Sequence, residues 1–368
     1  MKKNEPVLSY HDYLNLDLLL SAQKLESKKS GKKAHDEMLF IITHQVYELW
    51  FKQILFEIDS VLNDFSRKKI NESHIAGAVG RLGRINKIQE LLIDQIKILE
   101  TMTPMDFLDF RDLLTPASGF QSAQFRLIEN KIGLSVDNRH SYGGEDYKSK
   151  INKEQKDIIE KSEKSSSLFD LIEQWLERTP FLDFQNFNFW EQYRKSVDNM
   201  LSKEKDIINN NESLSKDEKQ NQLRQFNVTK KMFNSLFDKS SFSKRIKKGE
   251  SRLSYKATHA ALLIFLYRDQ PILHNPYKLL SRLIDLDELL TTWRYKHYLM
   301  ATRMIGRKIG TGGSVGAAYL NKATQKHRVF DDFTSLTTFL IPRSELPSLP
   351  EPVLRSLNFH YDIISDDN

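Results

Sequence analysis

A histidine at the centre of an apolar segment is the first residue that could carry chemistry. His44 lies within residues 35–53, and helical spacing places it on the same face as Phe40 and Tyr47. The opposite side of this segment is also apolar, which predicts a helix in the interior of the protein. A buried imidazole without a partner costs roughly 1–3 kcal/mol. Its partner would be a backbone carbonyl, a water molecule, a metal or a substrate.

A second histidine and an arginine occur in similarly apolar surroundings. His297 shares a helical face with Leu290 and Trp293, a setting in which one imidazole can ligate a haem iron. Arg111 lies among phenylalanines and leucines on a predicted helix that ends before Pro116, and its guanidinium suits a carboxylate. From the residues alone, simpler interpretations exist. His297 would be a core histidine that forms its hydrogen bonds within the protein, and Arg111 would pair with a neighbouring aspartate.

Two stretches rich in small residues could bind a ligand through the backbone. Ser118 and Gly119 are expected to begin the next helix, whose free N–H groups would favour an anion. Residues 310–316 are rich in glycine but lack the Gly-Lys-Ser/Thr ending of a phosphate-binding loop. A loop that closes over a small ligand is the better interpretation. The histidines show no zinc-site spacing, and no Gly-x-Ser-x-Gly nucleophile motif occurs.

The composition describes a globular, helix-rich chain. Hydrophobic residues make up 39% of its 368 residues and charged residues 28%, with only 10 prolines and 14 glycines. It has no cysteine, which excludes disulfides, thiolate nucleophiles, iron–sulfur clusters and thiolate-ligated haem. This absence fits a reducing cytoplasm, where we expect the protein to act.

Neither a membrane nor a nucleic acid is an expected partner. The longest strictly apolar run, residues 260–267, is far shorter than the roughly 20 residues of a spanning helix. The net charge is +6, and a basic cluster at 244–248 could suggest nucleic acid. Because acidic residues are interspersed elsewhere, a solvated surface is the better interpretation of that cluster.

The hydrophobic pattern predicts an all-α fold. Four apolar helical blocks stand out, at residues 36–64, 85–99, 254–268 and 279–305. Two intervening stretches are highly charged, which predicts a bundle core with a smaller charged helical subdomain. The expected division is a core formed by 1–149 and 241–345, a subdomain or insertion at 150–240, and a C-terminal tail at 346–368.

Taken together, these blocks resemble the tryptophan 2,3-dioxygenase family. The resemblance runs from about Tyr10 to Pro342, with the signatures in the same order. The matching blocks are Tyr10-His11-Asp12-Tyr13-Leu14, residues 35–53, Leu99-Glu100-Thr101-Met102-Thr103, residues 116–122, Trp175-Leu176-Glu177-Arg178-Thr179-Pro180, residues 310–314 and Leu340-Ile341-Pro342-Arg343. Departures fall in 135–165, in 200–226 and beyond Leu346, away from the expected site residues.

The resemblance implies an enzyme and a cofactor. A helical bundle would enclose haem b, and the reaction would insert O₂ across the indole C2–C3 bond of L-tryptophan. The product would be N-formyl-L-kynurenine, in the first step of tryptophan catabolism by the kynurenine route. The family also implies a homotetramer, in which Tyr10 and Tyr13 reach into the active site of a neighbouring subunit.

The resemblance also implies a role for each site residue. His297 would be the axial ligand of the haem iron, and Trp293, Ser118 and Gly119 would contact the cofactor. Arg111 would hold the substrate carboxylate, and Thr311 would contact the amino-acid end. The apolar slot for the indole ring would be lined by Phe40, Phe107 and Leu114. His44 would lie on the distal side, near the indole nitrogen, where it acts either as a base or only to orient the ring.

Three other classes of protein are alternatives to this interpretation. A haem-binding oxygen sensor or carrier would leave Arg111 and the glycine-rich loop without a function. A cofactor-free helical scaffold would use both histidines as core residues and would be colourless. A sister dioxygenase with looser indole specificity is the closest alternative, although Arg111 favours an unmodified amino acid.

Overall fold

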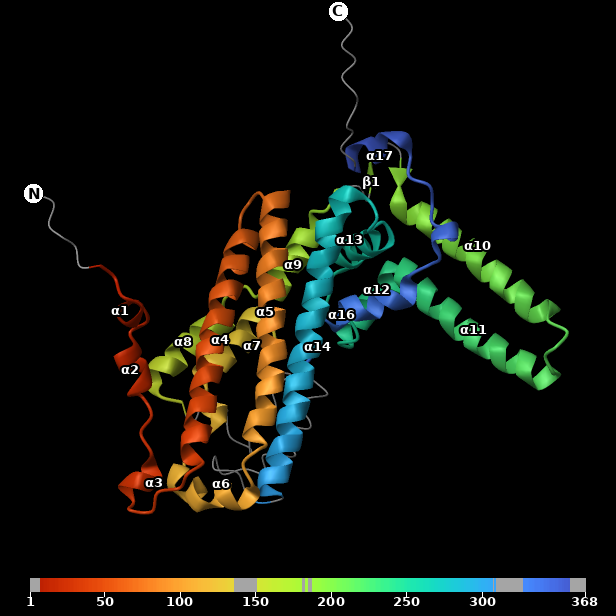
Figure 1. Cartoon of the computed structure of the whole chain (residues 1–368). Coiled ribbons are helices and arrows are strands. Elements are labelled where there is room, and N and C mark those ends of the chain that lie inside the picture. Colours follow the sequence, from red (N-terminus) through yellow and green to blue (C-terminus); the bar gives the residue numbers. More distant parts are fainter. Residues whose placement is uncertain are drawn as a thin grey trace, which may run out of the picture.

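Three long helices form the centre of the molecule (Figure 1). The computed structural model describes residues 7–135, 151–180, 183–184, 187–306, 308 and 327–357. The three helices are α4 (Glu37–Phe65), α5 (Glu72–Leu99) and α14 (Pro271–Ile305), and α5 packs against both of the others. The prediction of an all-α fold is therefore confirmed.

The remaining elements are short helices around this centre. The N-terminal part contains α1 (Tyr10–Leu14), α2 (Leu16–Leu20) and α3 (Glu26–Lys29). After α5 come α6 (Pro104–Arg111), the 3₁₀ turns η1 (Asp112–Leu114) and η2 (Gly119–Gln121), α7 (Ala123–Ile132), α8 (Lys153–Glu163) and α9 (Leu168–Glu177). The C-terminal part contains α16 (Asp331–Ser335), η5 (Leu336–Phe339), η6 (Arg343–Glu345) and α17 (Glu351–Leu357).

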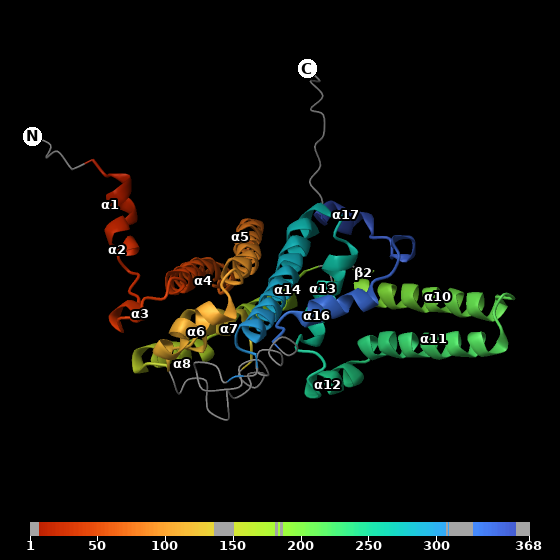
Figure 2. The ribbon, with the colours of Figure 1, turned by 60° about the horizontal axis from the view of Figure 1, so that its bottom comes forward.

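A helical hairpin extends from one side of the bundle (Figures 1 and 2). The small antiparallel pair β1 (Asp183–Phe184) and β2 (Phe187–Asn188) leads into it. The hairpin itself is α10 (Phe189–Asn210) and α11 (Lys216–Phe237), followed by α12 (Lys239–Lys247) and α13 (Tyr255–Leu266). In contrast, α8 and α9 pack against α7, α4 and α13 in the body of the molecule. The division at residues 150 and 240 stays a prediction.

Local sequence signals explain where the helices near the site begin. The Asn71 side chain accepts the backbone N–H of His74, and the His74 ring accepts the N–H of Asn71, so that α5 starts with a reciprocal cap. Thr103 and Asp106 form the same kind of cap for α6, whose first helical residue is Pro104. These caps fix the direction in which each helix leaves its turn.

The core has a large part and a small part. The large cluster fills the space between the three long helices, where Ile58, Leu82, Ile85 and Leu283 are completely buried. Burial of each such side chain contributes roughly 1.5–3 kcal/mol. The small cluster lies around α6 and the C-terminal end of α14, and it includes Phe110, which is also fully buried.

One predicted feature of α4 is wrong. The sequence predicts a helix buried on all sides, but Ile42, Leu49 and Phe56 are 44%, 51% and 70% exposed. They form a stripe on the side of α4 that faces away from α5, α7 and α9. Within the part of the chain that the structure describes, no helix is long and apolar enough to cross a membrane.

The hairpin is joined to the body through a buried histidine. The ring of His259 on α13 stacks on Trp190 of α10 at a centroid distance of 3.4 Å, and its edge meets Tyr255. Burial lowers the pKa of His259 from 6.5 to about 3, although a hydrogen bond to the Leu236 backbone opposes the shift. The ring is therefore neutral at physiological pH, and charging it would require its removal from this stack.

Replacing His259 with phenylalanine is expected to make the protein less sensitive to acid. Because the folded pKa lies below the ordinary value, the stability that depends on neutral His259 is complete above pH 6.5 and is lost as the pH falls toward 3. Between pH 7 and pH 5 this loss is about 2 kcal/mol. Urea denaturation at both pH values should show the wild type losing that much more than His259→Phe. Equal losses in the two proteins would contradict the assignment.

Candidate active site

A cavity of about 800 Å³ opens between the first half of α4, α6 and the segment that follows α6. Six of the predicted site residues line it: Phe40, His44, Phe107, Leu114, Ser118 and Gly119. Its other lining residues include many polar groups that sequence reasoning did not single out: Lys24, Glu26, Glu37, Gln45, Glu48, Gln121, Ser122, Gln124 and Gln155. The cavity therefore has an apolar wall and a polar wall.

Aromatic rings from α4 and α6 build the apolar wall. The ring of Phe40 lies 5.7 Å from that of Phe107 and 5.6 Å from that of Phe110. Phe107 and Phe110 meet edge to face, with centroids 5.5 Å apart and an interplanar angle of 88°. Such contacts add about 0.5–1.5 kcal/mol each beyond burial. Phe40 and Phe107 thus present an apolar surface to the cavity, and the fully buried Phe110 supports both rings from behind.

His44 stands beside this wall with one nitrogen already engaged. Its Nδ1 lies 2.7 Å from the Phe40 carbonyl oxygen, and because a carbonyl only accepts, Nδ1 carries the proton. The side chain is exposed to the cavity, but the protein atoms on its other sides still desolvate the ring. Burial lowers the pKa of His44, and the Phe40 carbonyl and the charge of Glu48 oppose the shift. His44 is therefore a neutral imidazole whose Nε2 can accept a hydrogen bond.

The polar wall is fixed by a contact between α7 and α4. The side-chain nitrogen of Gln124 donates to both the backbone carbonyl and a carboxylate oxygen of Glu48, each at 2.8 Å. Glu48 lies one helical turn after His44, so this contact holds a carboxylate beside the imidazole. The spacing of four residues was visible in the sequence, but the role of Gln124 was not, because the pair is separated by 76 residues.

His297 lies on α14, and its surroundings keep its imidazole uncharged. Its ring is parallel to that of Trp293, with an interplanar angle of 2° and centroids 5.3 Å apart. Burial, together with a smaller electrostatic effect of His44, lowers the pKa of His297 to about 4. Its Nδ1 is buried and has no hydrogen-bond partner within the described part of the chain. An uncharged imidazole of this kind suits a haem iron.

Trp293 connects His297 to the helices that build the cavity. Its ring contacts Tyr47 and Phe51 of α4 at 6.1 and 6.5 Å, and Phe125 of α7 at 5.2 Å. Neither Trp293 nor His297 is among the described residues that line the 800 Å³ cavity. The stacked pair therefore lies outside this cavity, and Trp293 packs against both hydrophobic clusters.

Arg111 is the last residue of α6 and also lies outside the described cavity lining. Its side chain is 16% exposed, and its Nη1 lies 3.5 Å from a carboxylate oxygen of Asp112. Because Asp112 is 90% exposed and the contact is long, the pair is weak. The local ion pair, which is the simpler interpretation of Arg111, is therefore weak enough for a substrate carboxylate to replace it.

Three further predictions concern the glycine-rich loop, the N-terminal tyrosines and the segment that begins at Ser118. Thr311 and residues 310–316 lie outside the described residues. Tyr10 and Tyr13 are 76% and 72% exposed and do not line the cavity; they belong to α1, which lies to one side of the three long helices (Figure 1). Ser118 and Gly119 do begin a helical segment, but it is only the 3₁₀ turn η2 (Gly119–Gln121); the α-helix α7 begins at Ala123, where the Ser122 hydroxyl accepts a backbone N–H.

Comparison with known proteins establishes the class to which this fold and site belong. The sequence pattern of tryptophan 2,3-dioxygenase matches residues 1–340. The chain therefore belongs to the tryptophan 2,3-dioxygenase family. It is 52% identical to the tryptophan 2,3-dioxygenase of Bdellovibrio bacteriovorus over 97% of this chain and 99% of that protein. It is 46% identical to that of Dictyostelium discoideum, over 96% and 89% of the two chains. The enzyme of Xenopus tropicalis is 45% identical, over 95% and 86%.

Truncation of Phe110 is expected to loosen the aromatic wall and lower stability. Phe110→Ala removes a fully buried ring that contacts both Phe40 and Phe107, at a cost of about 3–5 kcal/mol. Chemical denaturation measures the loss. The matched control is Ile207→Ala on α10, because Ile207 is 68% exposed and its truncation should change stability by less than about 1 kcal/mol. A Phe110→Ala protein as stable as this control would show that the wall is not packed as described.

Proposed function

We propose that this protein is a haem-dependent dioxygenase that converts L-tryptophan and O₂ to N-formyl-L-kynurenine. This reaction is the first step of tryptophan catabolism by the kynurenine route. The observation that carries the proposal is the family match over residues 1–340, together with two neutral imidazoles at one end of the bundle. Nearly full-length identity to three proteins named tryptophan 2,3-dioxygenase supports the same activity.

The cofactor of this proposal is haem b. His297 would be its protein ligand, because the ring is uncharged and is held in a fixed plane by Trp293. Ser118 and Gly119, which line the cavity, would contact the cofactor as well. When bound, haem supplies the chemistry with dioxygen that no amino-acid side chain can supply.

The apolar wall would bind the indole ring. Phe40, Phe107 and Leu114 line the cavity and would exclude water from the ring. Arg111 would exchange its weak contact with Asp112 for the substrate carboxylate, a charge-assisted contact with better geometry. Thr311 would contact the amino-acid end of the substrate.

His44 would orient the substrate through its Nε2. Because its Nδ1 donates to the Phe40 carbonyl, its Nε2 is an acceptor and suits the N–H of an indole. The lowered pKa keeps the ring neutral, so that it does not present a donor to this N–H. Orientation by a hydrogen bond does not require the indole nitrogen to lose its proton.

The proposed assembly is a homotetramer in the cytoplasm. Large apolar side chains are exposed along the N-terminal segment, among them Val7, Leu8, Tyr10, Tyr13, Leu18 and Leu20. The stripe formed by Ile42, Leu49 and Phe56 on α4 is exposed as well. Contiguous apolar surface of this kind is typical of an interface between subunits. Tyr10 and Tyr13 would complete the active site of a neighbouring subunit. The absence of cysteine supports the cytoplasmic location.

The function is tested by mixing reduced, haem-reconstituted protein with L-tryptophan in air and following the absorbance of N-formylkynurenine. The wild type should form this product, whereas His297→Ala should bind haem weakly and form none. A purified protein that takes up no haem would contradict the proposal. So would a His297→Ala variant that keeps a normal five-coordinate ferrous spectrum, since that result would remove His297 as the ligand.

Replacing His44 tests whether it orients the substrate or removes a proton. His44→Ala should weaken turnover and substrate binding without abolishing either, because the aromatic wall remains. Steady-state kinetics and a tryptophan titration of the haem spectrum give the two quantities. Complete loss of turnover with haem and tryptophan binding intact would instead establish an obligatory base.

A further inference from the structure

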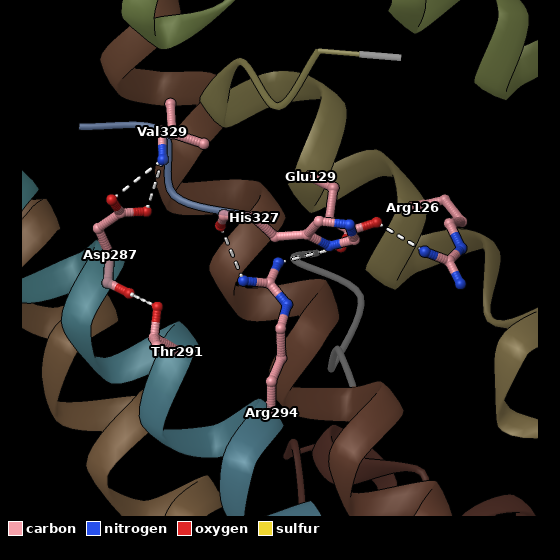
Figure 3. A network of polar contacts seen from close by, with 7 residues as sticks. All are labelled: Arg126, Glu129, Asp287, Thr291, Arg294, His327 and Val329. Atoms are coloured by element: carbon pink, nitrogen blue, oxygen red, sulfur yellow. Dashed lines mark hydrogen bonds and ion pairs between the residues drawn. The ribbon is translucent and has the colours of Figure 1, made fainter. Parts of the chain in front are cut away.

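A network of buried charges joins α7, α14 and the segment that begins at His327 (Figure 3). The carboxylate of Glu129 on α7 accepts from Arg126 at 2.7 Å and from Arg294 on α14 at 3.0 Å. Arg294 also donates to the backbone carbonyl of His327 at 3.1 Å. All four residues are at most 7% exposed. Charges so deeply buried are costly unless they are paired, so each contact strongly constrains the positions of its partners.

The network acts on the part of α14 that carries His297. Arg294 follows Trp293 directly and precedes His297 by three residues, so that the two side chains are neighbours on the helix surface. Phe125 of α7 packs on Trp293, and Glu129, one helical turn later on α7, pairs with Arg294. An aromatic contact and an ionic contact between α7 and α14 thus lie side by side. Together they restrict the rotation of α14 about its own axis.

The same face of α14 holds the segment that begins at His327. Asp287 lies two turns before Arg294, and its carboxylate accepts the backbone N–H groups of Val329 and Phe330 at 2.9–3.0 Å. Arg294 and Asp287 therefore hold this segment at two points (Figure 3). A rotation of α14 would break contacts at both points and also the pair with Glu129.

We propose that Arg294, held by Glu129, is a positioning residue that sets the direction of the His297 imidazole toward the haem iron. The proposal rests on the proposed function, in which His297 is the iron ligand. Arg294 itself contacts neither substrate nor cofactor in this arrangement. Its effect passes through the rotation of α14, and partners that orient a ligating histidine commonly matter roughly 10–100-fold to metal affinity.

The test compares variants of Arg294 with a matched control. Arg294→Met removes the contacts with both Glu129 and the His327 carbonyl. Arg294→Lys keeps the positive charge but lacks the planar guanidinium that makes both contacts at once. The control is Arg81→Met, which removes an ion pair between Arg81 on α5 and the buried Asp64 on α4, away from His297. Haem affinity is measured by titration, and the iron–histidine stretching frequency of the reduced protein by resonance Raman spectroscopy.

The expected result is a loss of haem affinity of roughly 10–100-fold in Arg294→Met, with a shifted or broadened iron–histidine band. Arg294→Lys should show the same band change with a smaller loss of affinity, and it provides the test if Arg294→Met does not fold. Arg81→Met should lower only stability. Affinity and band equal to those of Arg81→Met would overturn the proposal. If wild type and His297→Ala bind haem alike, the proposed function fails instead.

Discussion

The structure depends on the packing of α14 against α5 and α4, because this packing brings His297 and His44 to the same end of the bundle. Burial lowers the pKa of both imidazoles, and His44 acts electrostatically on His297. Neutral rings serve the proposed site in two ways, as a ligand for iron and as a hydrogen-bond acceptor for an indole. The geometry of three helices thus fixes both the position and the protonation state of the reactive groups.

Much of the fold could be predicted from helical spacing. The apolar blocks at 36–64 and 254–268 coincide with α4 and α13, because their apolar residues repeat with the helical period. The block at 85–99 covers only the second half of α5, since Gly77, Gly80 and Gly83 lower the helix propensity of the first half. Tertiary packing outweighs that local preference. The exposed stripe on α4 could not be foreseen, because periodicity shows which residues are apolar but not which side meets a neighbour.

For the candidate site, too, some contacts could be predicted from the sequence and others could not. Helical spacing predicts that Phe40 lies beside His44, and family resemblance alone adds Phe107 to them; all three line the cavity. The contact between Arg294 and Glu129 joins residues that are 165 positions apart, and no local pattern indicates such a pair. Ser118 and Ser122 are both good helix caps, and the sequence does not show that the first begins only the 3₁₀ turn η2 while the second begins α7.

One helix of 35 residues contributes to both hydrophobic clusters. Leu279 to Leu290 belong to the large core, whereas Met300 and Met304 belong to the small cluster beside the site. Because the same helix packs in both clusters, unfolding of the bundle centre would also remove the support that α14 gives to the small cluster. Heat or denaturant should therefore unfold the pocket and the bundle in one transition. Substitutions far from the pocket should then affect it through the stability of the whole bundle.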